Sequence, residues 1–312
     1  MSRVRSLFRR SLLKARGNQR IDPLMNRMFE IWYDMPFPPS HYYSPLPNVR
    51  SLKQNLARWY KEDTSPGIDW NVQEQLALLD ELRPYYAEVA ALPPFSQVTQ
   101  DGYGPGYGEI EALLLYMMLR RAKPARVVEI GSGVSTYYTL TALETNRKRD
   151  NVASTLTCVE PYPKDKLRTL AAERNVGLHE CQVQDAGLDI FHELGANDVL
   201  FIDSSHVSKK DSDVDFLFLE VLPRLREGVL IHIHDIAFPM PALPFDHFLF
   251  DTYLFWNENS LVKAFLLFNT SFRIEMCQSY LHHRNPDALK AIIPIYNPQT
   301  HFPTSLWIKR IR

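Results

Sequence analysis

The chain has few of the features that mark secreted or membrane-spanning proteins. It contains only three cysteines in 312 residues, Cys158, Cys181 and Cys277. An odd number cannot pair completely, and all three fall in segments expected to be strands, where a free thiol packs as a small apolar residue. No apolar run reaches the roughly 18 residues that cross a bilayer, and no apolar stretch of a signal peptide follows the basic first residues. We therefore expect a cytoplasmic protein.

Net charge is also nearly absent. Lys and Arg number 35 and Asp and Glu 36, which leaves −1 at pH 7. This balance gives no reason to expect a nucleic-acid partner. The exception is residues 1–20, which hold seven Lys and Arg and no acid. This segment also carries apolar residues at helical spacing, so we expect either a solvated terminus or a helix in weak contact with a membrane surface.

Proline and aromatic residues divide the chain into three expected parts. A basic segment covers residues 1–21, and a cap rich in proline and aromatic residues covers 22–100. Within the cap a helix is predicted at 72–89, kinked or split at Pro84 because proline cannot continue a helical hydrogen-bond ladder. Residues 101–312 are expected to form one large domain.

That domain opens with residues 101–108, where four of the chain's 12 glycines alternate with two tyrosines. Such a segment bends easily. It could be a lid that excludes water from a bound ligand, or a linker between cap and domain.

A cofactor loop is predicted after the apolar segment 126–130. Gly131 and Gly133 lack a β-carbon, so a ligand can lie against the backbone, and Ser135 and Thr136 are suited to capping the next helix. The dinucleotide fingerprint needs a third glycine where Thr136 stands. The pattern therefore disfavours a nicotinamide-dependent oxidoreductase.

The domain alternates strands and helices, as expected of an α/β protein with a parallel sheet and right-handed crossovers. Strands are predicted at 126–130, 155–160, 178–183, 199–203, 229–234, 272–277 and 305–309. Helices are predicted at 109–121, 135–147, 164–174 and 211–225. Ligands of such sheets bind at the carboxyl ends of the strands.

Polar side chains follow two of these strands. Asp203 ends the fourth strand and His206 follows it, while His234 and Asp235 end the fifth. Carboxylate oxygens with an imidazole suit a divalent ion, which could in turn bind oxygen atoms of a substrate. We predict Asp203, His234 and Asp235 as its ligands. The alternative is that the carboxylates accept hydrogen bonds from loop N–H groups.

His206 is the predicted general base, because imidazole titrates near neutral pH. Lys209 or Lys210 could take this role instead, and His206 could merely cap a helix. His232 lies one pleat deeper than His234 and is expected to be a core residue.

Together these motifs resemble class I S-adenosylmethionine-dependent methyltransferases. The resemblance implies a Rossmann-like, doubly wound sheet of seven strands, mostly parallel, with the last strand antiparallel. The residues it implies for the cofactor are Glu129, Gly131, Ser132 and Gly133 for the methionine part, Glu160 for the ribose hydroxyls, and Asp185, or Gln184 beside it, near the adenine.

The spacing from Asp203 to His206 resembles the D-x-x-H of metal-dependent sugar O-methyltransferases, in which the aspartate binds magnesium and the histidine is the proposed base. Those relatives have an acidic pair after the fifth strand, and catechol O-methyltransferases have Asp-Asn. The pair His234-Asp235 departs from both, which either shifts the preference from magnesium toward softer ions such as manganese, iron or zinc or leaves the site without a metal. The resemblance implies O-methylation of a sugar, glycosylated or phenolic small molecule.

Two alternatives stay open. An N-methyltransferase of the same fold would show much the same motifs, and a non-catalytic binding or assembly protein could keep the fold without the reaction. The aromatic residues between 238 and 259, Trp256 among them, could stack on an acceptor or simply form core.

Overall fold

The computed structural model describes residues 27–28, 30–31, 43–103, 106–241 and 247–312. The chain forms two compact units, one of residues 1–60 with 247–255 and one of residues 61–246 with 256–312. In the first unit, two short helices are α3 (Val49–Gln54) and α4 (Leu56–Trp59). The membrane contact predicted for residues 1–20 lies outside the described residues.

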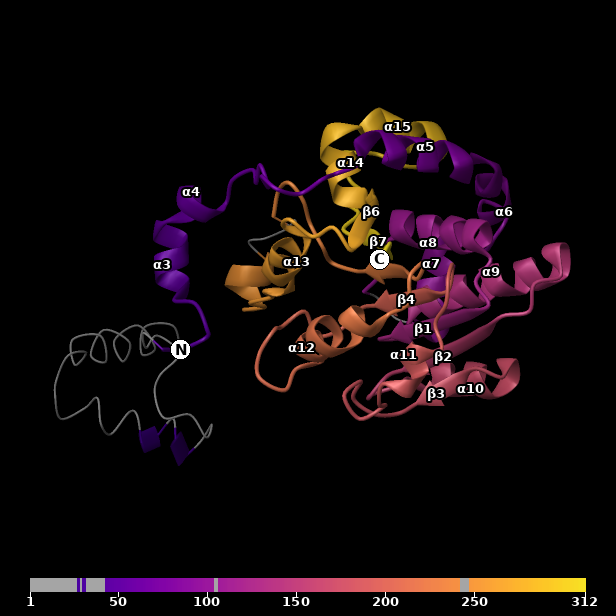
Figure 1. The fold of residues 1–312 in the computed structure, drawn as a ribbon. Helices are drawn as coiled ribbons and strands as arrows, with labels where there is room; N and C mark the ends of the chain where they lie inside the picture. The colour runs from indigo at the N-terminus through magenta and orange to yellow at the C-terminus, as the bar shows by residue number, and fades with distance from the viewer. Residues whose placement is uncertain (1–26, 29, 32–42, 104–105, 242–246) are drawn as a thin grey trace. The chain divides into compact units, whose positions relative to one another are not determined.

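The second unit is built on a sheet that has seven strands within the described residues, in the order β3-β2-β1-β4-β5-β7-β6 (Figure 1). Strand bounds are β1 Arg126–Ile130, β2 Thr155–Val159, β3 Gly177–His179, β4 Val199–Ile202, β5 Leu230–Ile233, β6 Phe272–Cys277 and β7 Leu306–Arg310. Strands β1 to β5 pair in parallel, and β7 is antiparallel to both β5 and β6. The expected doubly wound topology is confirmed.

One strand is shorter than predicted. The third strand was expected to reach residue 183, but β3 ends at His179 and pairs only with β2. Beyond it the polar Glu180 leaves the sheet and forms an ion pair with Arg168 of the neighbouring helix. As a result Cys181 lies outside any strand, whereas Cys158 and Cys277 lie in strands as expected.

Helices cover both faces of this sheet (Figure 1). Their bounds are α5 Val72–Leu82, α6 Tyr86–Val89, α7 Phe95–Val98, α8 Glu109–Ala122, α9 Val134–Asp150, α10 Asp165–Arg174, α11 Asp189–His192, α12 Asp213–Phe216, α13 Glu258–Leu266, α14 Gln278–Arg284 and α15 Pro286–Ile292. None of the described helices has the length and apolar composition needed to span a bilayer. The 3-10 turn η1 (Arg83–Tyr85) separates α5 from α6 and confirms the break predicted at Pro84. The helix predicted at 211–225 is only partly regular, because α12 continues as a π turn, η3 (Leu217–Val221), and a 3-10 turn, η4 (Leu222–Arg224), that contains a proline.

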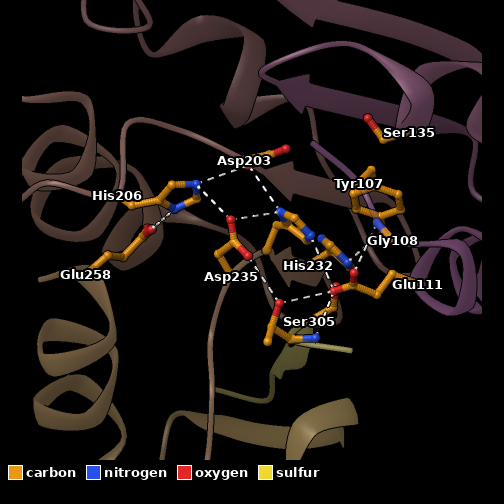
Figure 2. Close-up of polar contacts among 12 residues, drawn as sticks. Tyr107, Gly108, Glu111, Ser135, Asp203, His206, His232, Asp235, Glu258 and Ser305 are labelled. Atoms are coloured by element: carbon orange, nitrogen blue, oxygen red, sulfur yellow. Dashed lines mark hydrogen bonds and ion pairs between the residues drawn. The ribbon is translucent and has the colours of Figure 1, made fainter. Parts of the chain in front are cut away.

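Helix α8 carries charge into the core. It is buried from Ile110 to Arg120, so Glu111 and Arg120 need partners inside the protein. Arg120 forms ion pairs with Glu88 and Asp150, which ties together α6, α8 and the end of α9. Glu111 points instead toward the carboxyl edge of the sheet, where the candidate site lies (Figure 2).

Candidate active site

The loop after β1 is pressed against the loop after β4. Gly131 has a φ of 78°, a conformation that favours glycine, and a β-carbon there would overlap the carbonyl oxygen of Asp203. In addition, the N–H of Asp203 donates to the carbonyl of Ile130 at 2.9 Å. The two strand ends are therefore held together, and a side chain larger than hydrogen at position 131 would separate them.

A cavity of about 500 Å³ lies over the carboxyl ends of β1, β2 and β4, within the usual range for small-molecule sites. Gly131, Glu160 and Asp203 all line it. The Glu160 carboxylate accepts hydrogen bonds from the backbone N–H groups of Ser132, at 3.2 Å, and Tyr162, at 2.8 Å. Three of the residues predicted from separate motifs thus share one cavity.

Glu129 lies behind this cavity and does not line it. It is fully buried, and its Oε1 accepts hydrogen bonds from the hydroxyls of Ser135, at 2.6 Å, and Thr136, at 2.9 Å. Burial raises the pKa of Glu129 to about 8, although both hydroxyls act in the opposite direction. The Gly133 N–H donates to Thr136 Oγ1 at 3.0 Å. Glu129 therefore fixes the start of α9 beside the loop, and its contact with a cofactor stays a prediction.

Asp185 is not placed as predicted. It is exposed and does not line the cavity, whereas Gln184 does. The reason is a turn, in which the Asp185 N–H donates to the carbonyl of Gln182 at 3.0 Å and the following residues lead away from the cavity. Gln184 is thus the better placed of the two for an adenine contact.

The polar residues predicted at the ends of β4 and β5 come together as an acid–histidine cluster of Asp203, His206, His234 and Asp235 (Figure 2). His206 Nε2 lies 3.3 Å from Asp203 Oδ1 and 3.5 Å from Asp235 Oδ2. His234 Nδ1 lies at the same two distances from the same two oxygens. The three ligand atoms that all lie within 4.8 Å of one another belong to Asp203, His206 and Asp235. Geometry thus adds His206 as a candidate nitrogen ligand of a metal, while the predicted His234 lies equally close to the same two oxygens.

His206 also faces a third carboxylate. Its Nδ1 lies 2.8 Å from Glu258 Oε2, and both side chains are buried. Burial disfavours a charge on this ring, but hydrogen bonds and the charges of Asp203 and Glu258 outweigh burial and raise the pKa of His206 to about 10. In the protein without a bound cation both ring nitrogens face carboxylates, and the raised pKa keeps both protons on the ring near neutral pH. This arrangement argues against the predicted general-base role.

His234 has a corresponding partner, Glu111 of α8. His234 Nε2 lies 3.3 Å from Glu111 Oε1, which also accepts hydrogen bonds from the Thr304 N–H at 2.8 Å and the Ser305 hydroxyl at 2.9 Å. Glu111 Oε2 accepts a hydrogen bond from the Gly108 N–H at 3.1 Å. Burial opposes both charges. The charges of Asp203, Glu111 and Asp235 nevertheless raise the pKa of His234, and the His234 charge together with the hydrogen bonds from Thr304 and Ser305 lowers the pKa of Glu111.

Sequence reasoning missed Glu111 and Glu258. A signal for Glu111 existed, because it is an acid between the apolar residues Ile110 and Ala112, three residues after Gly108. Glu258 carried no comparable signal, since its contact with His206 spans 52 residues of sequence.

His232 is a core residue, as expected. It is fully buried, stacks on Phe201 with ring centroids 4.4 Å apart, and contacts the Tyr107 hydroxyl through Nε2 at 3.2 Å. Burial lowers the pKa of His232 to about 3, so the ring is neutral. The Tyr107 ring also lies 4.7 Å from that of His234. Tyr107 thus packs the end of the glycine-rich segment 101–108 onto the acid–histidine cluster, although residues 104–105 of that segment are outside the described part.

Sheet order and site together define a class of α/β proteins that hold a cofactor over the carboxyl ends of β1 and β2. Residues 128–236 match a family model described as a methyltransferase domain. An uncharacterized protein from Archaeoglobus fulgidus is 32% identical over 170 residues, which span 52% of this chain and 75% of that protein. The chain belongs to the class I S-adenosylmethionine-dependent methyltransferases.

Solved structures with similar folds were also found. A putative methyltransferase from Thermobifida fusca has 13% identity and a TM-score of 0.43, with 81% of this chain and 96% of that chain covered. An O-methyltransferase from Bacillus cereus in complex with SAH has 12% identity and a TM-score of 0.40, with 85% of this chain and 100% of that chain covered.

Proposed function

We propose that this methyltransferase transfers the methyl group of S-adenosylmethionine to a hydroxyl of a sugar, glycosylated or phenolic small molecule, with the help of a divalent cation. One observation carries the proposal. Asp203, His206 and Asp235 bring their ligand atoms within 4.8 Å of one another, and Asp203 also lines the cofactor cavity. A cation held by these residues would lower the pKa of a hydroxyl bound to it, so that its proton can pass to water. The oxygen would then bond to the methyl carbon as the carbon–sulfur bond breaks and S-adenosylhomocysteine leaves.

The local charge fits a cation. Among the described residues, the acid–histidine cluster and its two outer acids contain four carboxylates, those of Asp203, Asp235, Glu111 and Glu258, and two imidazoles. Even with both rings protonated, two negative charges stay uncompensated in a buried setting. Burial indeed raises the pKa of Asp235 and of Glu258. Two carboxylates with an imidazole suit manganese or iron better than magnesium.

The cavity fits a polar cofactor. Two buried side-chain oxygens of its lining, Ser204 Oγ and Gln184 Oε1, have no hydrogen-bond partner in the described part of the chain. Such atoms are expected to bond to a ligand. We assign Glu160 and Gly131 to the cofactor's binding as well. S-adenosylmethionine supplies a methyl group already activated on sulfur, so the protein's task is to align the acceptor oxygen with that group.

The acceptor would lie between this cavity and Trp256, whose ring centroid is 4.6 Å from that of His206. Trp256→Ala is expected to weaken acceptor binding without weakening cofactor binding. Of the other aromatic residues predicted to contact an acceptor, Phe245 lies outside the described residues.

The test is methyl transfer from labelled S-adenosylmethionine to a panel of catechols, glycosides and amines, with Mn²⁺ or with a chelator. We expect an O-methylated product that requires the cation, and Asp235→Asn should lower turnover by about 10²-fold. The matched control is Asp189→Asn, an exposed acid outside the cavity, which should change nothing. Transfer only to amines, or full turnover with the chelator, would contradict the proposal.

A further inference from the structure

We propose that Glu258 is a positioning residue for the cation site, which holds the His206 ring so that its Nε2 faces Asp203 and Asp235. This inference rests on the proposed cation site and names the residue that orients its nitrogen ligand. Glu258 is 1% exposed, and its Oε2 lies 2.8 Å from His206 Nδ1. Figure 2 shows the two side chains on the side of the cluster away from His232.

The backbone brings this pair together. The carbonyl of His206 accepts hydrogen bonds from the N–H groups of Asn257, at 3.0 Å, and Glu258, at 3.2 Å. The Asn257 side chain accepts from the Ser208 N–H at 2.6 Å and donates to the Ser208 carbonyl at 3.1 Å. The start of α13 is therefore joined to the loop after β4. His206 has a φ of 60°, which is uncommon for a residue other than glycine, and these bonds hold it there.

The contact has a definite chemical consequence. A carboxylate beside Nδ1 keeps the proton on that nitrogen, so the lone pair of the neutral ring is on Nε2, the atom that faces Asp203 and Asp235. Metal-binding histidines commonly have such an outer carboxylate, which fixes the ring and makes it a stronger ligand. The other oxygen, Glu258 Oε1, is buried without a hydrogen-bond partner among the described residues. Within the described residues, the Glu258 carboxylate thus has His206 as its side-chain hydrogen-bond partner.

Variants of Glu258 separate positioning from charge. Glu258→Gln keeps an acceptor oxygen at the same reach but loses the charge, whereas Glu258→Asp keeps the charge but is one methylene too short to reach Nδ1. If Glu258 positions the ring, Glu258→Asp and Glu258→Ala should bind Mn²⁺ about 10 to 100 times more weakly than the parent protein, and Glu258→Gln should lose less. Mn²⁺ affinity is measured by calorimetry and by the electron paramagnetic resonance of the free ion, in the absence of acceptor.

A matched control loosens the same helix elsewhere. Lys263 of α13 forms an ion pair with Asp63, and Lys263→Gln removes it without touching His206. Its Mn²⁺ affinity should equal that of the parent protein. A loss as large as that of Glu258→Ala would show that any weakening of α13 lowers the affinity, and would overturn the inference.

The outcomes distinguish this inference from the proposed function. If the parent protein does not bind Mn²⁺, the proposed cation site and the inference fall together. If the parent binds Mn²⁺ and Glu258→Asp binds equally well while Glu258→Gln does not, charge and not position matters, and only the inference falls. Should Glu258→Ala fail to fold, the comparison of Asp with Gln decides alone.

Discussion

The acid–histidine cluster has two outer arms that look alike and are built differently. In each, a histidine faces Asp203 and Asp235 with one nitrogen and a buried glutamate with the other (Figure 2). Glu111, behind His234, also accepts hydrogen bonds from two backbone N–H groups and two hydroxyls. Glu258, behind His206, has one oxygen on the histidine and the other without a partner in the described chain.

The difference indicates two roles. Because the Glu111 arm joins α8 to the start of β7 and to Gly108, its removal should affect folding more than chemistry. The Glu258 arm comes from a loop and a helix end and acts on one ring, so its removal should affect the site more than the fold. Variants on the two arms test this division.

The largest effect is expected for Glu111→Ala. This variant removes the carboxylate that faces the His234 imidazolium, and it leaves the N–H groups of Gly108 and Thr304 without their acceptor. All three groups are buried or half-buried. Removal of one partner of a buried ion pair typically costs about 3 to 5 kcal/mol. Urea unfolding should show a loss of this size, and a loss below about 1 kcal/mol would show that the arm is not structural.

The next largest effect is expected for His206→Ala. Turnover should fall by about 10²-fold, because a ligand of the cation and the orientation of Asp203 are lost together. The affinity for S-adenosylhomocysteine, measured by calorimetry, should stay unchanged, since His206 does not line the cofactor cavity. Unchanged turnover would remove His206 from the site.

Much of the fold could be predicted from local patterns. The apolar strands, the glycine loop and Pro84 each act through the backbone of nearby residues, so the sheet and the helix break followed from the sequence. The third strand was predicted too long because its end depends on where pairing with β2 stops. The local sequence does not distinguish a paired strand from an unpaired extended segment. The place of Asp185 was hard to predict for the same reason, since a turn of four residues, 182–185, decides that Gln184 and not Asp185 lines the cavity.

The candidate site was predictable only in part. Asp203 and Asp235 follow from the rule that parallel strands end at one edge. The partner of each histidine depends on contacts across the fold, so the pattern alone did not reveal that both nitrogens of His206 are engaged. Spacing can place a residue at an edge, but it does not show which of its atoms are free.

In the protein without a cation, the free energy of unfolding should depend on pH, because the histidines of both arms face carboxylates. The pKa of His206 is about 10 in the folded state and about 6.5 when unfolded. Its contribution to stability is therefore fully present below pH 6.5 and declines as the pH rises toward 10. The slope should approach about 1.4 kcal/mol per pH unit for each histidine that holds a proton only when folded.

Unfolding in a chelator at pH values between 6 and 9 measures this slope. In Glu258→Gln one of the charges that raise the His206 pKa is missing, so the decline should end at a lower pH than in the parent protein. A stability that does not change over this range would mean that the rings are neutral.

The smallest effect is expected for Ser305→Ala. This variant tests the role of the Glu111 arm alone, because it removes one hydrogen bond to Glu111 and leaves the ion pair between Glu111 and His234 in place. The Ser305 hydroxyl is buried and donates to Glu111 Oε1 at 2.9 Å, while the Thr304 N–H donates to the same oxygen. Loss of one such bond to a charged group should cost about 1.5 to 3 kcal/mol at most, and less here because that oxygen keeps a donor. Turnover and Mn²⁺ affinity should not change. If Ser305→Ala instead weakened Mn²⁺ binding as much as Glu258→Asp does, both arms would serve the cation site, and the assignment of separate roles would be wrong.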